Sequence, residues 1–157
     1  TPLDAALYSA MGVGAVMLTA AAPVIAWGIA RKDAPLLAPV LRWSIVLGLC
    51  LTFILGVGDG AVMSASRSGH FVGTVPTGHM TLPILGWSLA IGDLRVAHFL
   101  GLHALQIIPA FGLLVWCLTR QPRTGIAAIA AFSVVYTLVT VAAFVAALQA
   151  RPLLGLG

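Results

Sequence analysis

VAHFLGLHALQIIPAFGLLVWCL, residues 96–118, is an almost charge-free apolar run, and its length decides the fold. About 20 apolar residues are needed to cross the hydrocarbon core of a bilayer as a helix. Three further runs reach that length, at about 5–30, 37–64 and 126–148. None of the four alternates with a period of two, which excludes a β-barrel. The sequence therefore predicts an all-α membrane protein with four transmembrane helices in an up-down bundle.

The composition supports this class of protein. Of the 157 residues, 61% are hydrophobic and 8% are charged, whereas a soluble domain carries roughly 25% charged residues. We expect residues 1–157 to form a single transmembrane domain with a long cap loop at 65–94. Because the chain starts at Thr1 without a methionine, we also expect it to be either a processed chain or the trailing part of a longer one.

The basic residues predict an orientation in a bacterial inner membrane. The two short connections carry Arg31, Lys32, Arg42, Arg120 and Arg123. The opposite side carries Arg67, Arg95 and Arg151. Short cytoplasmic loops are enriched in Lys and Arg, so the termini and the long loop should lie outside. These residues form no basic patch, and no nucleic-acid partner is implied.

Polar residues share one sector of the third predicted helix. With His98 at zero and about 100° per residue, Arg95 falls at about 60°, Gln106 at about 80° and His103 at about 140°. We expect this face to turn into the bundle, because ionisable groups in a membrane avoid lipid. Asp93 precedes the helix and is predicted to be its N-cap.

The histidine spacing limits the chemistry. His98 and His103 are about 7.5 Å apart in helical rise, so they cannot be the two axial ligands of one haem or a good pair for one metal ion. A second ligand would have to come from His70 or His79 in the long loop. Possible neighbours there are Asp59, Met63 and Met80. A set of His and Met side chains at the outer face would suit copper, and a loop histidine opposite His98 would suit haem b.

Each of these candidate residues has an alternative, purely structural role. His98 would hydrogen-bond to the loop, and His103 would bond across helices to Tyr136 or Thr140. Asp59 and Arg95 would form an ion pair at the outer rim, and the loop histidines would be exposed to solvent. The candidate site residues thus fall into three sets: Asp59, Arg95 and Gln106 for a polar centre, His98 and His103 for a cofactor, and His70 and His79 for a metal.

Two further patterns predict helix packing. Small residues recur every four positions in the second helix, at Gly48, Thr52, Gly56 and Gly60. This spacing lets a neighbouring helix approach closely in lipid. The fourth helix carries a mildly polar face made of Ser133, Tyr136, Thr137 and Thr140. We expect it to form interhelical hydrogen bonds.

Three segments carry a resemblance to a known group: TPLDAALYSAMGVGA at 1–15, LPILGWS at 82–88 and GDLRVAHFLGLHALQIIP at 92–109. The chain resembles the C-terminal portion of a family of uncharacterised bacterial multi-pass membrane proteins. The resemblance implies further helices before Thr1 and a polar outer centre, and it implies no reaction. Where that family tends to have His after Thr-Pro-Leu, this chain has Asp4.

Three functions remain open from the sequence. The first is a membrane subunit or domain whose polar centre organises the third helix, the loop and a partner, which would be other membrane subunits or preceding helices. The second is a redox protein that binds haem b or copper through the histidines. The third is a small transporter or proton-conducting protein with His103 and Gln106 along its path. An enzyme is disfavoured, since the chain has no HExxH motif, glycine-rich phosphate loop or Ser/His/Asp spacing.

Overall fold

The computed structural model describes residues 2–31, 37–66, 69–74, 78, 80–119 and 121–152. Four long helices pack as a bundle: α1 (Pro2–Arg31), α2 (Pro39–Ala65), α3 (Leu94–Leu118) and α4 (Pro122–Leu148). All four are long and apolar enough to cross a membrane. The predicted fold class is thus confirmed, and the protein is a multi-pass membrane protein by the length and composition of its helices.

The helix starts follow from local chemistry. Pro2, Pro39 and Pro122 each stand at the first position of a helix, where the missing N–H group costs nothing. Helix α3 begins differently, because the Asp93 side chain accepts a hydrogen bond from the backbone N–H of Arg95. This confirms the predicted N-cap role of Asp93.

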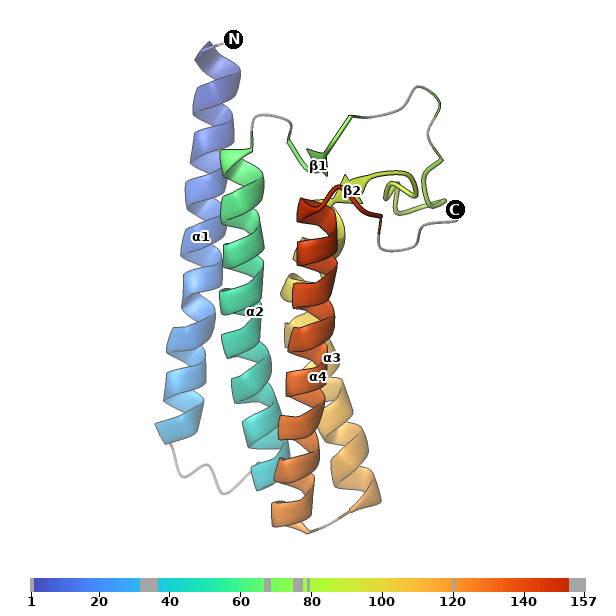
Figure 1. Ribbon diagram of the computed structural model, residues 1–157. Coiled ribbons are helices and arrows are strands. Elements are labelled where there is room, and N and C mark those ends of the chain that lie inside the picture. The colour runs from blue at the N-terminus through green and yellow to red at the C-terminus, as the bar shows by residue number, and fades with distance from the viewer. Residues whose placement is uncertain are drawn as a thin grey trace.

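Helix α2 lies between α1 and the α3/α4 pair (Figure 1). Its small residues form the expected seam with α3. A Cβ atom at Gly48 would come within 3.0 Å of the Ala104 carbonyl oxygen, and one at Gly56 within 2.8 Å of the Leu102 side chain. Thr52 adds a long hydrogen bond of 3.5 Å to the Leu102 carbonyl oxygen. Close backbone approach, rather than side-chain interdigitation alone, holds these two helices together.

The face of α3 that packs into the bundle differs from the prediction. Its buried positions include Ala97, Gly101, Ala104 and Ile108, which lie outside the polar sector that was expected to face inward. Gln106 is exposed. A Cβ at Gly101 would lie only 2.9 Å from the backbone nitrogen of Gly56. Small residues thus decide which side of α3 faces its neighbours, because tight backbone contact outweighs burial of the polar side chains.

Helix α4 closes the bundle against α3. Its Tyr136 hydroxyl donates a hydrogen bond of 2.5 Å to the carbonyl oxygen of Leu100. The Thr137 and Thr140 hydroxyls instead donate to carbonyl oxygens of α4 itself. The polar face of α4 therefore supplies one bond between helices, from Tyr136, among the residues that the structure describes.

The long connection folds into a cap at one end of the bundle. We call its described residues, 69–74, 78 and 80–93, the cap, and the end where they lie the cap end. It contains two short antiparallel strands, β1 (Phe71–Val72) and β2 (Gly92–Asp93). Helix α1 begins and α4 finishes at this same end (Figure 1). The predicted orientation, with this end outside, remains a prediction.

The cap also packs against α4 and α3. A Cβ atom at Gly92 would overlap the carbonyl oxygen of Ala147, so β2 can lie this close to α4 only because residue 92 is glycine. Trp87 packs on the cluster formed by Val96, Ala97 and Ala143. These contacts place the start of α3 and the cap in one fixed arrangement.

Candidate functional site

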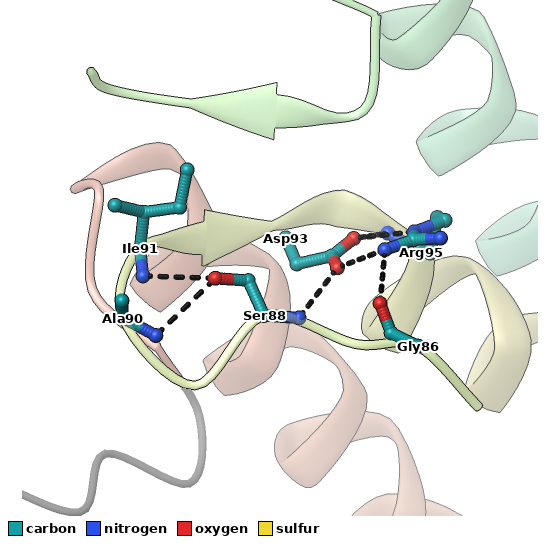
Figure 2. A network of polar contacts seen from close by, with 6 residues as sticks. All are labelled: Gly86, Ser88, Ala90, Ile91, Asp93 and Arg95. Carbon is teal, nitrogen blue, oxygen red and sulfur yellow. Dashed lines mark hydrogen bonds and ion pairs between the residues drawn. The ribbon is translucent and has the colours of Figure 1, made fainter. Parts of the chain in front are cut away.

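A network of polar contacts joins the cap to the start of α3 (Figure 2). Arg95 Nε donates to Asp93 Oδ1 at 3.0 Å, and Arg95 Nη2 donates to Asp93 Oδ2 at 2.7 Å. The backbone N–H of Ser88 also donates to Asp93 Oδ2, at 3.0 Å. The carboxylate is thus held by a bidentate guanidinium and by backbone groups, which is the strongest arrangement open to it.

Arg95 reaches beyond Asp93. Its Nη2 also donates to the carbonyl oxygen of Gly86 at 2.7 Å, nine residues earlier in the chain. Its guanidinium carbon lies 5.3 Å from the centre of the Phe71 ring in β1. Arg95 therefore ties together the strand β1, the turn before Gly86 and the first turn of α3.

The charges of this network shift the pKa values nearby. Burial acts to raise the pKa of Asp93, but the hydrogen bonds from Arg95 and Ser88 outweigh it and leave the pKa below its ordinary value. Burial and the positive charge of Arg95 lower the pKa of His70, against a smaller opposing effect of Asp93. His70 is therefore neutral and Asp93 ionised near pH 7.

The expected ion pair between Asp59 and Arg95 does not form. Arg95 pairs instead with Asp93, two residues earlier, whose side chain caps the start of α3. Asp59, on α2, is only 7% exposed, and its Oδ2 atom has no hydrogen-bond partner. Burial of a carboxylate oxygen without a hydrogen-bond partner costs free energy, above all at membrane depth. Asp59 is therefore not part of the network of Asp93 and Arg95.

His98 faces α2 across the helix seam. A Cβ atom at Gly60 would come within 3.2 Å of His98 Cε1 and 3.7 Å of its Nδ1. The Nδ1 atom is buried and has no hydrogen-bond partner. The predicted bond from His98 to the loop is thus not made by Nδ1. His98 also lines a groove between α1, α2 and α3.

His103 and Gln106 lie away from that groove. His103 Nδ1 is 2.8 Å from the carbonyl oxygen of Phe99 in its own helix, and its ring stacks on the Phe99 ring at 3.8 Å between centroids. The expected bond to Tyr136 or Thr140 is therefore replaced by a contact within α3. Gln106 is exposed. The prediction that His103 and Gln106 lie along a transport path stays untested.

His70 belongs to the cap rather than to the groove. It precedes β1, its carbonyl oxygen accepts a hydrogen bond of 2.9 Å from the N–H of Leu94, and its ring lies 4.1 Å from that of Phe71. His79 lies outside the described residues. Within the described part of the chain, no three His, Cys, Asp or Glu side chains gather around a point that would hold a metal ion. The haem b and copper predictions stay untested.

Two features of the site were missed in the sequence. Trp87 packs edge to face on Phe99, at 5.3 Å between centroids, and so continues the aromatic stack from His103 to the cap. The pairing of Asp93 with Arg95 was also missed. The spacing Asp-x-Arg at a helix start could have indicated it, since an N-cap carboxylate points at the residue two positions on.

Comparison with models of protein families, with curated proteins and with solved structures finds nothing that matches this chain. The four-helix membrane-like architecture is the part of the family resemblance that the structure shows.

Proposed function

We propose that this protein is an integral membrane subunit or domain in which the network of Asp93 and Arg95 fixes the cap on α3 and presents it to a partner membrane protein. The observation that carries the proposal is the bond from Arg95 to Gly86. Gly86 closes a turn in which Ile84 is fully exposed. Arg95 thus fixes the base of an apolar turn that nothing in the described chain covers.

The turn has the chemistry of a contact surface. Ile84, Leu85 and Met80 are all exposed, and residues 80–91 contain no charged side chain. Backbone bonds from Gly86 to Leu82 at 2.8 Å and from Leu85 to Pro83 at 2.9 Å make the turn compact. An exposed apolar patch on an ordered segment is typical of an interaction site.

Backbone strain at Ile84 supports the same role. Its φ angle is 74°, a left-handed conformation that β-branched residues rarely adopt. Such strain costs on the order of 1–3 kcal/mol and persists where the surrounding structure imposes it, often at functional sites. A glycine would fit the backbone better, so an isoleucine here supports a role for its side chain in the proposed contact with a partner.

The test places a photo-crosslinking amino acid at residue 84 or at the exposed Thr81 of the same segment. In native membranes we expect a crosslink to another membrane polypeptide from position 84 and none from position 81. Ile84→Ser should lower the native mass of the complex extracted in mild detergent, whereas Ile84→Val should preserve it. An unchanged mass for Ile84→Ser, or crosslinks to lipid alone, would overturn the proposal.

A further inference from the structure

Gln106 is an exposed amide at the middle of α3. It is the central residue of a helix of 25 residues and lies about 18 Å from either end. A helix that crosses a hydrocarbon core about 30 Å thick carries this side chain near the middle of the bilayer. The amide makes no hydrogen bond within the part of the chain that the structure describes. Because an unpaired amide is costly in lipid, we expect a partner from outside this chain.

Gln106 belongs to a row of residues that runs along α3, which we call the outer stripe. Its members follow each other in alternating steps of four and three: Phe99, His103, Gln106, Ala110, Leu113 and Cys117. His103 is half-buried and the other members are exposed. At about 100° per residue, the stripe lies opposite the face of α3 that packs on α2 through Gly101 and Ala104. Steps of four and three are typical of helices that pack side by side over their whole length.

The polar atoms of the outer stripe lie at one depth. His103 Nδ1 donates to the carbonyl oxygen of Phe99 at 2.8 Å, which leaves Nε2 as an acceptor in the neutral ring. It lies one helical turn from Gln106, about 4.5 Å along the axis. The Gln106 amide adds N–H donors and a carbonyl acceptor. A neighbour that satisfies this face must therefore offer both donors and acceptors at mid-membrane, and a lipid acyl chain offers neither.

We propose that the outer stripe is the contact surface between two copies of this chain, and that their Gln106 amides pair across a two-fold axis. All copies of a membrane chain insert in one orientation, so a two-fold axis along the bilayer normal brings each residue opposite its own counterpart at the same depth. An amide suits this arrangement because it donates and accepts, so two amides exchange a reciprocal pair of hydrogen bonds.

This self-complementarity favours a second copy over an unrelated helix, which would have to carry a matching polar group at the same depth. A single buried amide also fixes the register of a helix pair, as Asn does in two-stranded coiled coils. The inference goes beyond the proposed function and does not rest on the cap or its partner.

The test uses the full chain with Cys50→Ala, in phosphatidylcholine liposomes. Cys117 is exposed on the outer stripe. Counterparts in such a contact approach to Cα separations of about 4.4–6.8 Å, which a disulfide needs. Oxidation with copper phenanthroline and oxygen should therefore link two chains through Cys117. After Cys117→Ala, a new cysteine from Leu113→Cys on the same stripe should link them as well.

Leu118→Cys, also combined with Cys117→Ala, is the matched control. Leu118 is the next residue along α3 and is 78% exposed, but it lies about 100° away from the stripe. Its cysteine should give only the low yield of random collisions. This comparison separates a specific contact from crowding in the liposome.

The role of Gln106 is measured by the crosslink yield through Cys117 as the protein is diluted with lipid. Gln106→Leu removes the amide and should raise the apparent dissociation constant of the pair about fivefold or more. Gln106→Asn keeps an amide and should retain most of the association. Leu105→Ala changes an exposed neighbour at similar depth that lies off the stripe, and it should leave the dilution curve unchanged.

The pairing of two copies is overturned if Cys117 and Leu113→Cys give no more linked chain than Leu118→Cys does. It is also overturned if Gln106→Leu leaves the dilution curve where it was. In native membranes, a link from Cys117 to a different polypeptide in place of a second copy would assign the outer stripe to another membrane protein.

Discussion

Arg95 donates to both carboxylate oxygens of Asp93, from Nε at 3.0 Å and from Nη2 at 2.7 Å. The two residues are neighbours in sequence, so their pairing needs no distant contact. Asp93 is only 3% exposed, whereas the Arg95 side chain is 32% exposed. The arginine thus compensates a buried charge while it remains within reach of solvent and of the Gly86 carbonyl oxygen.

Removal of Arg95 should loosen the cap without unfolding the bundle. Arg95→Ala leaves the Asp93 carboxylate buried with fewer donors, at a cost of about 1–3 kcal/mol. We expect amide hydrogen exchange in 80–93 to rise about tenfold or more, with exchange in α2 unchanged. Arg95→Lys should give an intermediate result, since an ammonium group cannot bond both oxygens in the same planar way. Arg123→Ala, at an exposed position, is the control.

The cap should lose stability in acid. The pKa of Asp93 in the folded protein lies below its ordinary value of 3.8. Its contribution is therefore fully present above that value and is lost as the pH falls through the folded pKa. Exchange at Ser88 and Leu94, measured in His70→Gln protein to remove the histidine titration, should rise below about pH 4. In Asp93→Asn protein, the amides of Ser88 and Leu94 should exchange faster at all pH values, with no further rise in acid. If the rise below about pH 4 remains in this variant, another group causes it.

Gly92→Ala should displace the cap from α4. The added Cβ atom would overlap the Ala147 carbonyl oxygen, and backbone on both sides leaves little room to adjust. We expect a loss of about 1–3 kcal/mol, typical of overpacking, seen as a lower midpoint of thermal unfolding in detergent. Gly58→Ala is the matched control, because a Cβ atom there meets nothing within 4 Å. If both variants unfold at the same temperature, the close contact at Gly92 is not structural.

Tyr136→Phe should weaken the α3/α4 contact slightly. It removes the hydroxyl that bonds the Leu100 carbonyl oxygen and keeps the ring in place. Hydrogen bonds between membrane helices are worth on average about 0.6 kcal/mol, so the midpoint of thermal unfolding should fall by a few degrees at most. Thr137→Val removes a hydroxyl that bonds within α4 and should leave exchange in α3 unchanged. A larger effect from Thr137→Val would contradict this assignment.

Ile84→Gly should stabilise the cap while it removes the exposed side chain. Glycine adopts a φ angle of 74° without steric strain, so the turn should gain about 1 kcal/mol or more. Lower amide exchange at Leu85 and Gly86 would measure the gain. Ala150→Gly relieves a similar conformation at the end of α4, where φ is 57°, and serves as a control that leaves the apolar turn intact. Faster exchange in the Ile84→Gly turn would show that the side chain holds it in place.

Much of the fold was predictable because it depends on local composition. The four helices follow from apolar length, and the N-cap of α3 follows from an aspartate that precedes the helix. The seam on α2 was also predictable, since Gly48, Gly56 and Gly60 allow close approach whatever the neighbour is. The hydrogen-bond partners of the candidate site residues were predicted less well. They depend on how each helix is rotated about its axis and how far it is shifted along its neighbours.

The sequence by itself determined that this protein is a bundle of four membrane-length helices and that Asp93 begins the third of them. Only the tertiary structure decided how they pair. Polarity predicted that His103 and Gln106 face inward, but the tight contact between Gly101 and Gly56 turned that side of α3 outward. Arg95 paired with Asp93 rather than Asp59, because the start of α3 places the side chains of residues 93 and 95 close together. Packing of backbone against backbone set the rotation of α3, and no pattern of polar residues along the chain encodes it.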